Sequence, residues 1–304
     1  MGEVNGDTSP HSGAAERIEL GAHTLPYRAY PFERALEGIA GCGYRYVGIW
    51  NDHAGTSVVA PDAGEAEIEA VRRQIDRAGL IPRMAFRFRG ASGDEAGQLR
   101  RTVEVAGALG IPFVISTGPS PYAGRAFEAR KRDMLFLRQA QEYIATLREL
   151  APLAERLGVT IVMKPHMGVT GTGEDLADLV EAIDHPAVRI CYDAGNIAFY
   201  EGLVPEEDVK TCAHYVRTVC IKDHRGLRAN LDFPLPGQGD VDHTAIFRTL
   251  LDAGFSGPAL IERIDGLNSA EEIDQALRRA KDYLESAISQ AQAQAKVRVT
   301  ETTR

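Results

Sequence analysis

Four charged residues stand in otherwise apolar runs of the sequence, and their types suit proton transfer. They are Lys164 in TIVMKPH, Asp193 in ICYDAGN, Lys222 in VCIKDH and Glu262 in ALIERI. A buried charge is costly unless it is paired, so we expect these groups to meet one another, a metal or a ligand. A carboxylate can remove the proton beside a carbonyl, and a cation can stabilise the enolate oxygen that forms. The pattern therefore predicts a site for proton abstraction.

The residues expected to be catalytic are Glu262, Lys164, Asp193 and His166. Glu262 is the expected general base, with a pKa raised by its apolar surroundings. Lys164 would be a substrate clamp, a base with a lowered pKa or an imine-forming amine, or else only a structural ion-pair partner. Asp193 has a structural alternative too, because it could simply accept backbone hydrogen bonds in the YDAGN turn.

The residues expected to bind substrate are polar or aromatic groups near the ends of the same kind of run: Lys222, Trp50, His23, His53, Arg87, Asn196 and His224. Trp50 offers an apolar face of the kind on which sugars stack, and Arg87 could bind a phosphate or carboxylate. Each has a structural alternative, since a lone strand-end histidine is often a hydrogen-bonded wall residue and Arg87 in FRFRG could be a solvated strand end. Cys220 is expected to belong to the core rather than to act as a nucleophile.

Short β-branched or aromatic runs alternate with amphipathic stretches along the chain. The expected strands are 17–23, 44–50, 82–88, 112–118, 159–166, 188–196, 216–223 and 258–264. The expected helices are 31–41, 62–79, 93–109, 127–157, 174–184, 205–214, 243–253 and 269–288. Eight strand–helix pairs predict an α/β fold, a parallel (β/α)8 TIM barrel, whose active site lies at the C-terminal strand ends. An open doubly wound sheet is disfavoured, because GAHTLPY after the first strand is not a GxGxxG turn.

The alternation is not interrupted by a linker, which predicts a single domain. We expect residues 1–15 to be a disordered tail, 16–288 the barrel, and 289–304 a helical and then polar tail. The segment 124–158 is expected to form two helical pieces, with Pro152 beginning a new turn.

Composition excludes several classes of protein. The chain has 304 residues, 44% hydrophobic and 25% charged, and a net charge of −9, which disfavours nucleic acid and anionic membranes as partners. Its four cysteines form no CxxC pair, and no signal-peptide pattern or long apolar span occurs, so a cytoplasmic location is expected. The expected partner is a small-molecule substrate, and a homo-oligomer is left open.

The chain resembles the xylose isomerase-like TIM barrels, also called the sugar phosphate isomerase/epimerase family. The resemblance is carried by VMKPHMG, CYDAGNIAFYEG, VRTVCIKDHRG and PLPGQGDVDHTAIFRTLLDAGFSGPALIE. It implies a divalent metal, often manganese, on a Glu, an Asp, a His and a Glu from strands 5 to 8, with the two glutamates shuttling a proton. Asp193 and Glu262 match this pattern, whereas Lys164 takes the place of the first Glu and Cys220 that of the His.

The replacement of Glu by Lys164 changes the charge of the site by two units, which is the charge of the ion that the family holds. The ammonium group could therefore take the electrostatic role of the metal. A shifted metal site remains an alternative, because His166, Asp193, His224 and Glu262 supply groups that manganese or zinc accept. The cofactor prediction is accordingly none or a divalent metal (Mn²⁺, Mg²⁺ or Zn²⁺).

The leading hypothesis is an isomerase or epimerase of carbohydrate metabolism that abstracts a proton beside the carbonyl of a polyhydroxylated or keto-sugar-like molecule. A lyase or dehydratase is the first alternative, since the same abstraction leads to elimination when a leaving group stands on the next carbon. Such an enzyme could be metal-independent and use Lys164 as an imine-forming amine. A non-catalytic ligand-binding or assembly subunit is the second alternative.

Overall fold

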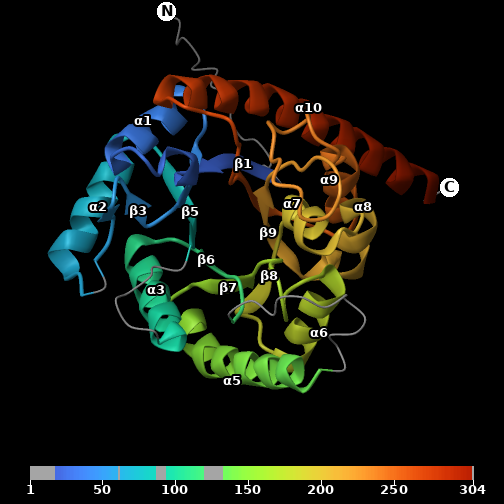
Figure 1. Ribbon diagram of the computed structural model, residues 1–304, viewed down its shortest axis with the longest axis horizontal. Coiled ribbons are helices and arrows are strands. Elements are labelled where there is room, and N and C mark those ends of the chain that lie inside the picture. The colour runs from blue at the N-terminus through green and yellow to red at the C-terminus, as the bar shows by residue number, and fades with distance from the viewer. Residues whose placement is uncertain (1–17, 61, 87–93, 120–132, 303–304) are drawn as a thin grey trace, which may run out of the picture.

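The computed structural model describes residues 18–60, 62–86, 94–119 and 133–302. Eight parallel strands in this part of the chain close into a barrel in the order β1-β10-β9-β8-β7-β6-β5-β2 (Figure 1). They are β1 (Ile18–His23), β2 (Tyr46–Ile49), β5 (Ile81–Phe86), β6 (Phe113–Ser116), β7 (Thr160–Met163), β8 (Val188–Tyr192), β9 (Val216–Ile221) and β10 (Gly257–Ile261). The predicted TIM barrel is confirmed.

Helices surround the barrel and bury their apolar faces against it (Figure 1). The α-helices in the described residues are α1 (Phe32–Gly41), α2 (Glu65–Arg77), α3 (Glu95–Leu109), α5 (Met134–Arg156), α6 (Gly173–Ile183), α7 (Ala194–Asn196), α8 (Pro205–Asp208), α9 (His243–Asp252) and α10 (Ala270–Thr302). The long α10 packs against β1, α1 and α9. Among the described residues no helix has the length and hydropathy that a membrane span needs.

A second, smaller core fills the inside of the barrel. Its buried members are Met84, Phe86, Ile115, Val162, Cys191, Cys220 and Leu260. Inward-pointing side chains of alternate strands stack in layers in barrels of this kind. This apolar plug supports the polar mouth above it.

Some boundaries differ from the sequence prediction. The strand expected at 188–196 ends at Tyr192, because the Asp193 side chain accepts a hydrogen bond from the Asn196 N–H and begins α7. The expected helix at 205–214 is instead the four-residue α8 followed by 3-10 turns at Val209–Thr211 and Ala213–Tyr215. The first region lies at the mouth, whereas the second ends directly before β9 begins, at the opposite end of the barrel.

The break expected at Pro152 is wrong, because α5 runs unbroken from Met134 to Arg156. Leu147, Leu150, Ala151 and Ala154 are all buried, so one apolar face continues past the proline and offsets its lost hydrogen bond. The tail expected at 289–304 is the continuation of α10 as far as Thr302. The tail expected at 1–15 lies outside the described residues.

Candidate active site

The four charged residues form one buried cluster, which we call the charged ring: Lys164, Asp193, Lys222 and Glu262. The Lys164 Nζ lies 2.7 Å from Asp193 Oδ2 and 2.9 Å from Glu262 Oε2. The Lys222 Nζ lies 2.9 Å from Glu262 Oε1 and 3.3 Å from Asp193 Oδ2. No member is more than 6% exposed. Each ammonium group therefore contacts both carboxylates, and the ring carries no net charge.

The barrel itself brings the ring together. Each member is the first residue after a strand: Lys164 follows β7, Asp193 follows β8, Lys222 follows β9 and Glu262 follows β10. These four strands are consecutive neighbours in the barrel. Lys222 and Glu262 are level in the register of β9 and β10, whereas Asp193 is level with Cys220 and Lys164 with Cys191, an offset of two residues at each step. Side chains alternate with a period of two, so an offset of two keeps all four on the same face, at the C-terminal mouth.

Asn196 locks the ring from one side. Its Oδ1 accepts a hydrogen bond from Lys222 at 3.0 Å, and its Nδ2 donates to the Pro165 carbonyl at 2.7 Å. Its own N–H donates to Asp193 Oδ1. Gly195 is required here, because a Cβ at this position would lie 2.2 Å from Lys222 Cγ. Asn196, expected to bind substrate, thus has a positioning role in this geometry.

The ring fixes the protonation of its members. Burial alone would raise the pKa of Glu262, but the ammonium groups of Lys164 and Lys222 hold it well below its usual value. The expected raised pKa of Glu262 is therefore wrong. Burial alone would lower the pKa of Lys164, but the carboxylates of Asp193 and Glu262 raise it well above its usual value. Glu262 is thus an ionised carboxylate, and Lys164 is an ammonium ion.

Two histidines flank the ring in neutral form. Burial lowers the pKa of His23 to about 3, and its Nε2 lies 3.6 Å from Cys220 Sγ. Its Nδ1 is buried without a hydrogen-bond partner in the described structure. Burial and the two ammonium groups of the ring lower the pKa of His166 to about 4. Both imidazoles can therefore donate or accept a hydrogen bond but carry no charge at neutral pH.

Two other histidines are occupied by the protein. The ring nitrogens of His53 lie 3.1 Å from the Tyr30 carbonyl and 3.0 Å from Thr24 Oγ1. The His224 Nε2 lies 2.8 Å from the Asn230 carbonyl. These partners favour the structural alternative for His53 and His224 over contact with substrate.

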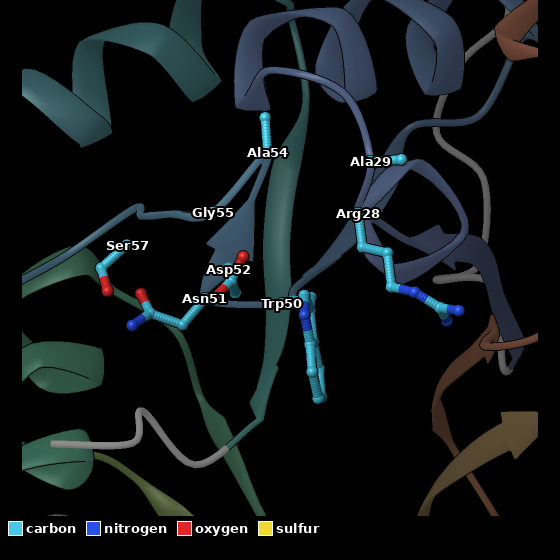
Figure 2. Close-up of a pocket in the computed structure, with 8 residues that line it drawn as sticks. All are labelled: Arg28, Ala29, Trp50, Asn51, Asp52, Ala54, Gly55 and Ser57. Carbon is cyan, nitrogen blue, oxygen red and sulfur yellow. The ribbon is translucent and has the colours of Figure 1, made fainter. Parts of the chain in front are cut away.

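A pocket of about 480 Å³ lies beside the mouth, at the small hairpin formed by β3 (Asp52–His53) and β4 (Thr56–Ser57). Figure 2 shows the Trp50 indole extending from the chain between the side chains of Arg28 and Asn51. A second hollow, of about 250 Å³, is lined by Arg28 and by Glu262. Arg28 and Ala29 line both hollows. Phe86 packs against Trp50, and its ring centre lies 5.9 Å from Lys164 Nζ, so one aromatic side chain stands between Trp50 and the charged ring. Arg87 lies outside the described residues.

A divalent metal fits this donor set poorly. Among the described residues, the group with metal-binding atoms within 4.8 Å of one another is Asp193, Cys220 and Glu262. Lys164 Nζ lies against both carboxylates of that group, where a cation would sit. His166 does not join the group, since its Nε2 faces Tyr200, so the predicted shifted metal site is not assembled by these side chains.

The sequence prediction did not include several residues at the mouth. Tyr200 OH lies 3.0 Å from His166 Nε2. Phe86 packs edge-on against Trp50, and the Arg263 guanidinium lies 4.2 Å from the centre of the Phe233 ring. Only the aromatic residues of YDAGNIAFYEG could have drawn attention to Tyr200, because no charge marks it.

The comparisons with known proteins agree with this fold. The inosose dehydratase of Clostridium botulinum (strain Alaska E43 / Type E3) is 29% identical over 161 residues, which are 47% of this chain and 53% of that protein. That of Geobacillus kaustophilus (strain HTA426) is 28% identical over 177 residues, which are 53% of this chain and 57% of that protein. The chain thus spans about half the length of the curated relatives it matches.

Solved structures share the whole barrel at lower identity. D-psicose 3-epimerase of Clostridium cellulolyticum H10 superposes with a TM-score of 0.68 at 14% identity, covering 89% of this chain and 99% of that one. A xylose isomerase domain protein of Alicyclobacillus acidocaldarius gives 0.69 at 21%, covering 90% and 99%. The family model for the xylose isomerase-like TIM barrel matches residues 36–285. The chain is therefore a member of the xylose isomerase-like TIM barrel family.

Proposed function

We propose that the protein is a dehydratase that removes the proton beside the carbonyl of a polyhydroxylated ketone and then expels the hydroxyl of the next carbon as water. The observation that carries this proposal is the direct contact between the ionised Glu262 and the ammonium groups of Lys164 and Lys222. A base and its neighbouring cations then act on one face of a substrate. This arrangement suits enolate formation, in which charge moves from the base to the carbonyl oxygen.

The charge changes during the step fit the ring. When Glu262 accepts the proton from carbon, it loses its negative charge and weakens its hold on both ammonium groups. The enolate oxygen gains the charge that Glu262 has lost, so Lys164 and Lys222 can turn to it. The charged ring gains one positive charge as the enolate gains one negative charge, so ring and enolate together remain neutral and no buried charge is left unpaired.

The same geometry disfavours epimerisation by two carboxylates. The resemblance implies a Glu on strand 5 as the second proton carrier, and Lys164 occupies that place. The remaining carboxylate, Asp193, already accepts the Asn196 N–H and faces both ammonium groups. With Lys164 in that place and Asp193 engaged by these groups, the charged ring offers no second carboxylate free to carry a proton on the other face of the reacting carbon.

Two observations support a proposal for the substrate class: the name of the sequence relatives and the residues beside the mouth. The sequence relatives bear the name inosose dehydratase, which points to a keto-cyclitol. Trp50 supplies an apolar face for a cyclitol, and Arg28 and the exposed Asp52 supply charged groups beside it. We propose a keto-cyclitol or a similar keto-sugar as substrate. A cytoplasmic location and a homo-oligomer stay predictions of the sequence.

The test is incubation of the purified protein with an inosose and with a panel of ketohexoses, followed by mass spectrometry. A dehydratase yields a product lighter by one water, and Glu262→Gln abolishes it. The exposed Glu149→Gln serves as the matched control. A wild-type protein that leaves every substrate unchanged would contradict the proposal.

Isomerisation is the second candidate, because an enolate formed on one face can also be reprotonated at the neighbouring carbon on that face. The fold shared with sugar epimerases favours keeping it. The same experiment separates the two, since an isomer has unchanged mass and carries solvent deuterium when formed in D2O. An imine at Lys164 is disfavoured by its ammonium form, and borohydride trapping tests it.

A further inference from the structure

We propose that Tyr200 is the general acid that protonates the departing hydroxyl, and that His166 is the positioning residue that aims it. The inference rests on the proposed dehydration and adds a catalytic residue to it. Its observations are the placement of Tyr200 on a π-helix, its contact with His166, and the saturation of the charged ring.

The ring has no free N–H to give. An ammonium group has three hydrogens. Lys164 Nζ faces Asp193 Oδ2 and both carboxylate oxygens of Glu262, while Lys222 Nζ faces Asn196, Asp193 and Glu262. When Glu262 is protonated, it releases N–H groups of Lys164 and Lys222, and the enolate oxygen needs these groups. A separate acid is therefore required at the carbon that loses its hydroxyl.

Tyr200 lies close to the charged ring. It follows β8 on the π-helix Ile197–Glu201, which begins directly after Asn196, the residue that locks the ring. Its phenol is half-buried and lies within electrostatic range of Lys164, Asp193 and Glu262. Single turns of π-helix in proteins are frequent at functional sites.

His166 contacts the hydroxyl group of Tyr200. The Tyr200 OH lies 3.0 Å from His166 Nε2, and the two rings lie 4.5 Å apart between centres. His166 is neutral, so its Nε2–H can donate to the phenol oxygen. In that tautomer the phenol hydrogen is free to point to the substrate.

The loop after β9 fixes the backbone of the same turn. The Ala229 N–H donates to the Phe199 carbonyl at 2.8 Å, and Arg228 Nε donates to the Tyr200 carbonyl at 2.6 Å. Ala229 adopts φ 63°, a left-handed conformation that costs a non-glycine residue free energy. Two hydrogen bonds from one loop thus hold the π-turn and keep Tyr200 in a defined place.

The proton count balances. The carbon–oxygen bond breaks with its electron pair on oxygen, which takes the proton of Tyr200 and leaves as water. The enolate electrons form the new carbon–carbon double bond. Glu262 then holds the proton from carbon and Tyr200 is a phenolate, so one proton passing from Glu262 to Tyr200 through solvent restores both groups.

The test compares leaving groups in Tyr200→Phe. One probe is an inosose, and the other is its analogue with fluorine in place of the departing hydroxyl; fluoride is a weaker base than hydroxide and leaves with less need of a proton. We expect dehydration to fall about 100-fold or more, the scale of a general acid. Fluoride release and deuterium exchange at the proton-losing carbon should stay close to wild type. Tyr215→Phe, which alters an exposed hydroxyl bonded to Glu181, is the matched control.

Each outcome of this comparison supports or contradicts the role proposed for Tyr200. An equal loss on both probes, or no loss on either, would overturn the role of Tyr200. The rates of dehydration and fluoride release are measured on one preparation, so partial unfolding of the variant lowers both together. Thermal melting recognises such unfolding. In that case His166→Gln repeats the comparison, because this variant retains the Tyr200 phenol. A wild-type protein that releases neither water nor fluoride would overturn the proposed function itself.

Discussion

Two ion-paired clusters in this molecule use the same chemical groups in different surroundings. In the charged ring, the side chains of Lys164 and Asp193 are 3% and 0% exposed. Between α1 and α10, the side chains of Arg34 and Asp274 are 26% and 17% exposed, and Asp274 also accepts a hydrogen bond from Tyr27. The outer pair joins two helices far apart in sequence, whereas the ring joins four strands that the barrel already holds.

The difference in burial between the two clusters indicates what each cluster contributes to the protein. A partly exposed pair retains water and contributes little to stability, so it can be lost at small cost. A buried ring must be complete, because desolvation is repaid only when every charge is paired. Replacing a buried ion pair by apolar side chains is often neutral or stabilising, so a contribution to stability does not by itself account for the ring.

The largest expected effect is on turnover. Glu262→Gln removes the proposed base and should lower the rate of water loss by about 10²–10⁴-fold, the usual contribution of general base catalysis. Arg34→Met, in the outer pair, should leave the rate unchanged. Steady-state kinetics on the substrate identified above measures both. Equal turnover in Glu262→Gln and wild type would remove Glu262 from the chemistry.

The next effect is on stability. Lys164→Met leaves two buried carboxylates with one cation and should lower the free energy of unfolding by about 3–5 kcal/mol. Arg34→Met should lower it by about 1 kcal/mol or less. Urea unfolding measures both. Adding Glu262→Gln to Lys164→Met should recover part of the loss, since the two residues are coupled; additive losses would contradict that coupling.

A third prediction concerns metal. Lys164→Glu combined with Cys220→His restores the family pattern of ligands, so the double variant should bind Mn²⁺. At a concentration about 100 times the dissociation constant, binding should stabilise it by about 2.7 kcal/mol, seen as a rise in melting temperature. The wild type should show no such rise, and a chelator should leave its turnover unchanged. Loss of wild-type activity on chelation would disprove the role given to Lys164.

The smallest effect is a pH slope. The pKa of His23 falls from 6.5 to about 3 on folding, so the unfolded chain binds a proton that the folded chain does not. The stability that neutral His23 contributes is therefore complete above pH 6.5 and is lost as pH falls, by about 1.4 kcal/mol per unit. His23→Leu should reduce the slope of unfolding free energy between about pH 6 and 5, while exposed His214→Gln should not. An unchanged slope in His23→Leu would contradict the shift.

The sequence allowed the barrel and the ring to be predicted for a physical reason. Apolar strands alternated with amphipathic helices, and a charge directly after each of four strands stood out against its neighbours. Strand alternation then placed Lys164, Asp193, Lys222 and Glu262 at one mouth. Each charge can be recognised from its own stretch of sequence, and the closed barrel brings the four side chains into contact.

The predictions that were wrong or incomplete depend on contacts between different segments of the chain, which a local sequence pattern does not reveal. The sequence does not tell that His53 is held by Thr24 and Tyr30, so a strand-end histidine looks available. The raised pKa expected for Glu262 considered burial but not the strength of two cations on one carboxylate. Tyr200 was missed because it carries no charge and lies between the strand expected to end at 196 and the helix expected to begin at 205.

The π-turn also has an evolutionary consequence. A π-helical turn holds one residue more than the α-helical turn it replaces. Deleting a single residue between Ile197 and Glu201 would restore ordinary helix and rotate the side chains after the deletion by about 100° around the helix axis. A relative lacking that one residue would keep the barrel and its four charges yet present a different side chain to the bound molecule, so chain length at this turn is a simple marker for sorting family members by chemistry.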